Sequence, residues 1–151
     1  MHDLAIASAD RNTNALPGEE SPRHHILVVE DDDFIRQMNV ACLLRGGYEV
    51  DAAADGSIAW EALSTRHYDL LLTDNHMPNF CGVALIQKLR SAGITLPVIL
   101  ASAMSEAEWK QVTALHLDAM LPKPYTLAEL LHSVQHVLAF AEAKLETPLV
   151  A

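Results

Sequence analysis

Short apolar runs alternate with amphipathic stretches along this chain, and this alternation limits the folds open to it. Several runs are continuous stretches of Leu, Ile and Val, as in strands that are buried on both faces. Between them, apolar residues recur at helical spacing. The expected strands span residues 26–29, 48–53, 70–73, 98–101 and 119–121. The expected helices span residues 34–45, 57–64, 83–91 and 105–115, and a last one begins at residue 126.

Strands that alternate with helices in this way form a parallel sheet with helices on both faces. Crossovers between parallel strands are right-handed, so the sheet should be doubly wound. We therefore predict a doubly wound α/β domain over residues 24–141. Residues 1–23 are rich in polar residues and turn formers and residues 142–151 lack periodicity, so both segments are predicted to be flexible.

Charge and composition exclude several classes of function. The chain has 20 acidic and 10 basic residues, a formal charge of −10, which disfavours binding to nucleic acid. No apolar stretch approaches the roughly 20 residues that span a bilayer, and no secretory signal is evident. The two cysteines, Cys42 and Cys81, do not form a disulfide framework. We expect a cytoplasmic protein with no membrane contact.

Charged and hydroxyl side chains follow the expected strands where these end. Acidic residues 30–33 follow the first strand, and Asp74 follows the third. Ser102 stands at the end of the fourth strand, and Lys123 follows the fifth. In doubly wound folds this edge of the sheet holds the binding site. Crowded carboxylates need a cation, and oxygen ligands of this kind favour Mg²⁺. Asp32 and Asp33 are better interpreted as helix N-caps than as metal ligands.

Four segments carry a resemblance to a known family. They are Ile26 to Asp32, Leu70 to Pro78, Val98 to Ala103 and Leu121 to Tyr125. In this order, each at an expected strand end, they resemble the receiver domain of two-component response regulators, and the resemblance covers residues 25 to about 140. It implies a flavodoxin-like (βα)5 fold, whose five parallel strands lie in the order 2-1-3-4-5 when numbered along the chain.

The resemblance also assigns roles to individual residues. It makes Asp74 the phosphoacceptor. Glu30 and Asp31 become the acidic pair that holds Mg²⁺, together with Asp74 and the backbone carbonyl of His76. Lys123 becomes the lysine that contacts the phosphoryl group, and Ser102 the switch hydroxyl. The Lys123–Pro124 peptide resembles one that is cis in the family.

Some positions depart from the commonest pattern of the family. Met120 stands where many members have an aromatic residue that couples to the switch hydroxyl. His76 and Met104 lie two residues beyond Asp74 and Ser102, at positions that resemble those tuning the lifetime of the acyl phosphate. His132 and His136 could share one helix face, but a metal site is disfavoured there without a third ligand.

The resemblance implies a stand-alone receiver that a sensor histidine kinase or histidine phosphotransfer protein phosphorylates. Such a protein assists its own phosphorylation and dephosphorylation but is a signalling domain rather than an enzyme. It would act on an unknown downstream protein, and could form a homodimer through residues 105–115, 119–121 and the last helix. Two alternatives are a receiver fold that acts without phosphorylation and a flavodoxin-like enzyme or nucleotide binder. The second lacks a Gly-rich phosphate loop after the first strand.

Overall fold

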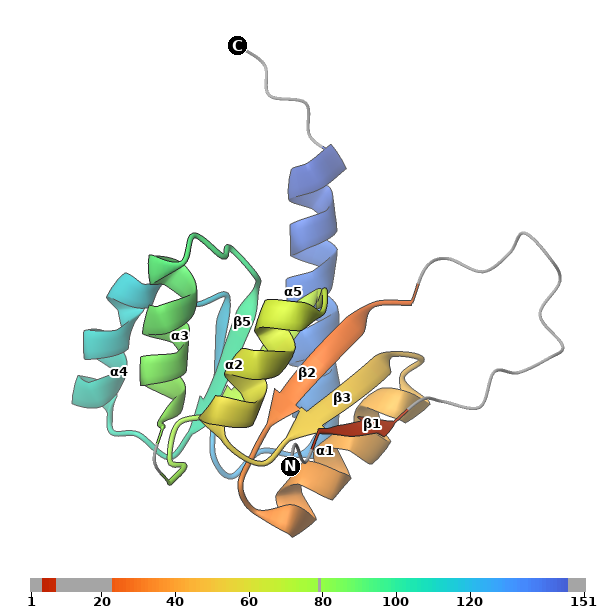
Figure 1. Ribbon diagram of the computed structural model, residues 1–151, viewed down its shortest axis with the longest axis horizontal. Coiled ribbons are helices and arrows are strands. Elements are labelled where there is room, and N and C mark those ends of the chain that lie inside the picture. The colour runs from red at the N-terminus through yellow and green to blue at the C-terminus, as the bar shows by residue number, and fades with distance from the viewer. Residues whose placement is uncertain (1–3, 8–22, 79, 147–151) are drawn as a thin grey trace, which may run out of the picture.

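A six-stranded sheet forms the centre of the computed structural model, which describes residues 4–7, 23–78 and 80–146 (Figure 1). The strands lie in the order β1-β3-β2-β4-β5-β6. They are β1 (Ala5–Ala7), β2 (His25–Val29), β3 (Glu49–Ala53), β4 (Leu70–Asp74), β5 (Val98–Ser102) and β6 (Ala119–Pro122). The five strands from β2 to β6 are parallel, which confirms the predicted five-stranded parallel sheet and its strand order.

The sixth strand, β1, differs from the prediction of a flexible segment over residues 1–23. It pairs antiparallel with β3, with Ala5 opposite Ala52 and Ala7 opposite Val50. Without it, the outer edge of β3 would present unpaired backbone N–H and C=O groups, which attract a further strand. Three residues suffice for this pairing, too few to give a recognisable period. The rest of the predicted arm, apart from Leu4 and Arg23, lies outside the described residues.

The helices cover both faces of the sheet, as predicted. Helices α1 (Asp33–Arg45) and α5 (Leu127–Glu146) pack on one face, and α2 (Gly56–Thr65), α3 (Gly82–Ser91) and α4 (Glu106–Val112) on the other, as Figure 1 shows. A short 3-10 turn, Thr113–Leu115, follows α4. Alternate residues of β2 point to opposite faces: Leu27 joins one apolar cluster and Val28 the other, both fully buried. Within the described part of the chain, each helix is too short or too polar to cross a bilayer.

Local signals in the sequence set several helix starts. The Asp32 carboxylate accepts a hydrogen bond from the backbone N–H of Ile35 (2.9 Å), which confirms its prediction as the N-cap of α1. Thr126 and Glu129 form the predicted capping box at the start of α5. Helix α5 extends to Glu146, beyond the predicted domain end at residue 141. Its last turns consist mostly of Ala, Glu, Lys and Leu, which have high helix propensity.

A buried carboxylate lies near the antiparallel edge of the sheet. Asp51, in β3, is 1% exposed. Its Oδ2 accepts a hydrogen bond from the Tyr68 hydroxyl (2.6 Å) and lies 3.1 Å from His25 Nε2 and 3.3 Å from Arg66 Nη1. Burial, together with the neighbouring Asp51 carboxylate, raises the pKa of Tyr68 well above its usual range. The hydroxyl therefore remains protonated and donates to Asp51.

Two leucines of α5 provide a test of the core. Leu130 is fully buried against the sheet, whereas Leu145 is 87% exposed. Leu130→Ala should lower the free energy of unfolding by about 2–5 kcal/mol, because it leaves a cavity among packed side chains. Leu145→Ala should change it by less than about 0.5 kcal/mol. Urea denaturation followed by circular dichroism measures both. Equal losses in the two variants would contradict this packing of α5.

Candidate functional site

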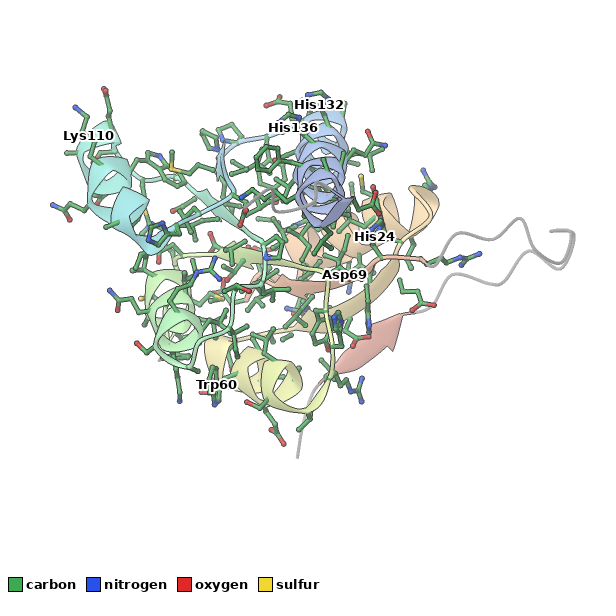
Figure 2. The ribbon with its side chains drawn as sticks, turned by 90° about the horizontal axis from the view of Figure 1, so that it is seen from above. His24, Trp60, Asp69, Lys110, His132 and His136 are labelled. Atoms are coloured by element: carbon green, nitrogen blue, oxygen red, sulfur yellow. The ribbon has the colours of Figure 1, made fainter. Side chains whose placement is uncertain are left out.

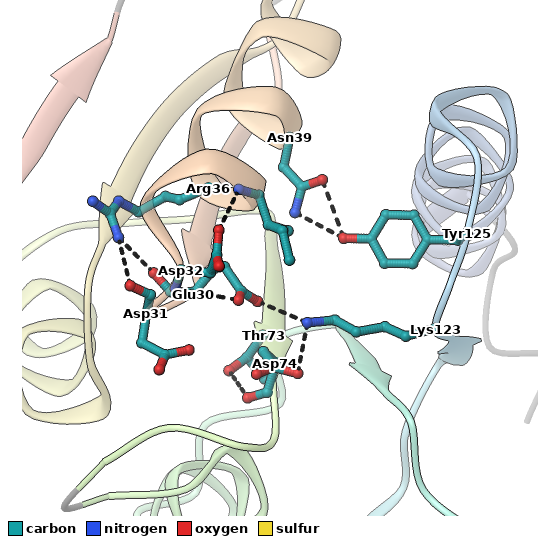
Figure 3. A network of polar contacts seen from close by, with 10 residues as sticks. Glu30, Asp31, Asp32, Arg36, Asn39, Thr73, Asp74, Lys123 and Tyr125 are labelled. Carbon is teal, nitrogen blue, oxygen red and sulfur yellow. Dashed lines mark hydrogen bonds and ion pairs between the residues drawn. The ribbon is translucent and has the colours of Figure 1, made fainter.

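Three charged side chains meet at the carboxyl ends of β2, β4 and β6, as Figure 3 shows. Glu30 follows β2 directly, Asp74 is the last residue of β4, and Lys123 follows β6. Strands β2 and β4 are parallel neighbours, with Val29 opposite Thr73. The residues that follow this pair therefore emerge side by side. The structure thus brings together three residues that the sequence placed at separate strand ends.

The Lys123 ammonium lies between the two buried carboxylates. Its Nζ is 3.2 Å from Glu30 Oε2 and 3.1 Å from Asp74 Oδ1. Burial lowers the pKa of Lys123, but the two carboxylates raise it by more, so that the net pKa lies above its ordinary value. Burial and the Asp74 charge raise the pKa of Glu30, and Lys123 offsets only part of this rise. The site therefore holds more negative charge than one ammonium balances.

Asp31 adds a third carboxylate on the solvent side. Glu30, Asp31 and Asp74 each offer an oxygen atom, and these atoms lie within 4.8 Å of one another. Asp74 Oδ1 is buried and lies 3.1 Å from the Lys123 ammonium, with no further hydrogen-bond partner among the described residues. Three clustered oxygen donors, one of them partly unsatisfied, fit a hard divalent cation such as Mg²⁺.

The loops on either side of the site are fixed by hydrogen bonds. Arg36, in α1, donates to the backbone carbonyls of Glu30 (2.8 Å) and Asp31 (3.4 Å), as Figure 3 shows. The side chain of Asn75 accepts a hydrogen bond from the backbone N–H of Val83. The backbone carbonyl of Asn75 accepts another from the backbone N–H of Gly82. The backbone around both carboxylates is therefore anchored to the first turns of α1 and α3.

Gly82 allows α3 to start against the end of β4. A Cβ atom at this position would lie 2.3 Å from the Asp74 carbonyl oxygen and 3.1 Å from Asn75 Cα. Real Cβ atoms do not approach backbone so closely, so any other residue must move the loop that carries Asp74.

The remaining predicted residues lie at different depths around the cluster. Ser102 is fully buried, and its Oγ has no hydrogen-bond partner among the described residues. His76 is exposed in the loop after Asp74. Met104 is half-buried and packs against the apolar cluster beneath α2, α3 and α4. Met120, on β6, is 43% exposed and lies opposite Leu100 of β5.

The pair formed by Asn39 and Tyr125 was not expected from the sequence. Asn39, buried in α1, donates from Nδ2 to the Tyr125 hydroxyl (2.9 Å), which in turn donates to Asn39 Oδ1 (3.1 Å), as Figure 3 shows. Tyr125 follows the Lys123–Pro124 peptide, which is cis, as the resemblance implied. The pair thus ties the segment that carries Lys123 to α1. A lone polar residue on the inner side of α1 was the available signal.

The sequence and the fold are similar to those of known receiver domains. The family model of the response regulator receiver domain matches residues 26–135 of this chain. The chain is 38% identical over 130 residues to the sensor histidine kinase RcsC of Escherichia coli, a match that covers 82% of this chain and 14% of that protein. It is 36% identical over 112 residues to the transcriptional regulatory protein DltR of Streptococcus agalactiae, covering 73% and 50% of the two chains. The chain thus spans half or less of these relatives.

Two solved structures are similar over nearly their whole length. The receiver domain of the Francisella response regulator 1452 superposes with a TM-score of 0.76 at 29% identity, covering 79% of this chain and 99% of that one. The response regulator TrrA of Thermotoga maritima, solved in complex with Mg²⁺ and BeF, gives a TM-score of 0.69 at 28% identity, covering 76% and 98%.

The contact at Gly82 can be tested by adding one methyl group. Gly82→Ala should lower the free energy of unfolding by about 1–3 kcal/mol, because the new Cβ collides with backbone that cannot rotate away. Gly46→Ala is the matched control, since there the nearest atom is the flexible end of the Leu131 side chain, at 2.8 Å. Urea denaturation should show the smaller loss for Gly46→Ala. The reverse order would refute the close approach of α3 to Asp74.

Proposed function

The chain belongs to the family of response regulator receiver domains, and on that premise we propose that it accepts a phosphoryl group on Asp74. Receiver domains are signalling domains rather than classical enzymes. One observation carries the proposal: Asp74 Oδ1 lies 3.1 Å from the Lys123 ammonium, and carboxylate oxygens of Glu30, Asp31 and Asp74 lie within 4.8 Å of one another. A carboxylate placed beside an ammonium and an acidic pair suits attack on phosphorus.

Mg²⁺ is the cofactor of the proposed reaction. Glu30, Asp31 and Asp74 would hold it, with the backbone carbonyl of His76 as a further proposed ligand. When bound, Mg²⁺ offsets the negative charge of the carboxylates and of the phosphoryl oxygens. The similar protein from Thermotoga maritima was solved with Mg²⁺ and BeF, a group that resembles phosphoryl, which supports this assignment.

The residues of this chain position and neutralise the reacting groups. An Asp74 carboxylate oxygen attacks the phosphorus of a phosphohistidine, an O–P bond forms, and the P–N bond breaks. The imidazole leaves with the electron pair of that bond and takes up a proton from solvent. Lys123, whose raised pKa keeps it protonated, neutralises charge on the equatorial oxygens of the transferred group. The chain in this sense assists its own phosphorylation, and water later reverses it.

Ser102 is the proposed switch. Its buried hydroxyl has no partner among the described residues, so a phosphoryl oxygen on Asp74 would supply an acceptor. Movement of Ser102 toward that oxygen would pull on the loop between β5 and α4 and change the surface around α4 and β6. Met120 offers no ring to follow this movement, so its coupling to the surface should differ from that of relatives with an aromatic residue. His76 and Met104 are proposed to set the access of water to the acyl phosphate.

The proposed donor is a sensor histidine kinase or a histidine phosphotransfer protein in the cytoplasm. The relatives of this receiver include a sensor histidine kinase and a transcriptional regulatory protein. The region that matches is 14% of the length of the kinase and 50% of the length of the regulatory protein. We propose that this receiver acts as a separate protein, through contacts with a downstream protein or with a second copy. The face for a homodimer would consist of α4, β6 and α5.

Phosphorylation can be followed by intact mass. Incubation with acetyl phosphate and Mg²⁺ should add the mass of one PO3 group, and Asp74→Asn should abolish the addition. Asp33→Asn is the matched control, since Asp33 is an exposed acid that pairs with Arg36 outside the cluster. An unchanged wild-type mass would favour a receiver fold that acts without phosphorylation.

The switch can be followed through Trp109, one of two tryptophans, which is half-buried in α4. In a Trp60→Phe background, Mg²⁺ and beryllofluoride should shift the Trp109 emission, and Ser102→Ala should remove the shift. Ser102→Thr, which keeps the hydroxyl, should restore it. Since the Ser102 hydroxyl is buried and unpaired among the described residues, Ser102→Ala should fold with little loss of stability. An equal shift in Ser102→Ala would refute the switch.

A further inference from the structure

Two histidines lie side by side on the outer face of α5, away from the sheet (Figure 2). The rings of His132 and His136 stack with their centroids 6.4 Å apart and an interplanar angle of 19°. Both side chains are exposed. Neither imidazole forms a hydrogen bond or ion pair with another described residue, so all four ring nitrogens are available to bind a ligand.

The chemistry of this pair differs from that of the acidic cluster. Imidazole nitrogen is a good ligand for Zn²⁺, whereas Mg²⁺ prefers oxygen ligands. Residues four apart on a helix are neighbours on its surface, and two histidines at this spacing can bind the same ion. Rotation about the side-chain bonds of two exposed residues costs little, so both rings can turn one nitrogen toward a shared zinc ion.

The surrounding charge favours a cation. Between Leu127 and Ala143 the sequence of α5 contains the acidic residues Glu129 and Glu142 and no lysine or arginine. Glu129 stands three residues before His132, on the neighbouring part of the same surface. No basic side chain of α5 itself therefore lies near enough to the pair to repel a bound zinc ion.

Two ligands leave the coordination of zinc incomplete. A structural zinc ion takes four ligands in a tetrahedron. Among the described residues, the one group of three or more acidic, histidine or cysteine side chains placed to share an ion is Glu30, Asp31 and Asp74. The part of the chain that the structure describes thus places no third ligand beside the His132–His136 pair. A second copy of the same pair would supply the other two ligands.

The helix surface around the pair suits a second copy of α5. Ala139 and Ala143 continue the ridge of His132 and His136 at positions i+7 and i+11, and both are exposed. Small side chains let two helices approach closely enough for both histidine pairs to reach one ion. Because each chain carries a formal charge of −10, two copies repel each other, and the zinc ion offsets part of that repulsion.

We propose that His132 and His136 from two copies bind one Zn²⁺ ion and form a zinc-dependent homodimer through α5. The zinc site is separate in position and chemistry from the acidic cluster at the carboxyl ends of the strands. It does not depend on the phosphorylation of Asp74.

The test compares the mass of the full chain in solution with and without zinc. Excess Mg²⁺ is present throughout, so that the acidic cluster is already filled. On addition of ZnCl2, light scattering coupled to gel filtration should show a twofold rise in mass. Elemental analysis should find one zinc ion for every two chains, and EDTA followed by fresh Mg²⁺ should restore the monomer.

Variants separate this site from other histidines and from the proposed function. His132→Ala and His136→Ala should each abolish the zinc-dependent rise in mass, whereas His67→Ala, which removes an exposed histidine elsewhere, should retain it. All three should still gain one PO3 group from acetyl phosphate, so a failure of phosphorylation would be distinct from a failure of zinc binding. A wild-type chain that stays monomeric, one zinc per chain, or a dimer that survives in His132→Ala and His136→Ala would each overturn the proposal.

Discussion

An imbalance of buried charge dominates this structure. Glu30 and Asp74 are 3% and 5% exposed, and the single ammonium of Lys123 lies between them. Removing carboxylates from water is costly unless a cation compensates them, and one lysine cannot compensate two buried carboxylates and the adjacent Asp31. The surplus of negative charge fits the proposed binding of a divalent cation. The same lysine and the cation could then neutralise a transferred phosphoryl group.

The parallel sheet is what creates this imbalance. Neighbouring parallel strands end at the same edge, so β2 and β4 deliver Glu30 and Asp74 side by side, and the long side chain of Lys123 reaches both from β6. The surrounding contacts keep these groups in place. Gly82 lets α3 begin against the Asp74 backbone, and Tyr125 ties the segment after Lys123 to α1. Together, these contacts hold three charged groups within ion-pair distance although they are far apart in the sequence.

Much of the fold and the site follows from local signals in the sequence. The run from Ile26 to Val29 is buried on both faces, as its composition predicts, and the capping residue Asp32 lies where α1 begins. Features that depend on tertiary pairing could not be predicted in this way. The strand β1 exists only because the edge of β3 accepts it, and the carboxylate of Asp51 is buried only because Tyr68 and His25 surround it. Neither partner is near in the sequence, so no local pattern reveals the contact.

We propose that Asp74, in the presence of a divalent cation, is the residue that takes up phosphoryl. Borohydride reduces an aspartyl phosphate to homoserine, and this mark survives digestion. Peptide mass spectrometry after reaction with acetyl phosphate and reduction should therefore find homoserine at position 74 when Mg²⁺ is present, and a much smaller amount when EDTA replaces it. Homoserine at another aspartate, or the same yield at position 74 without the metal, would contradict metal-dependent phosphorylation of Asp74.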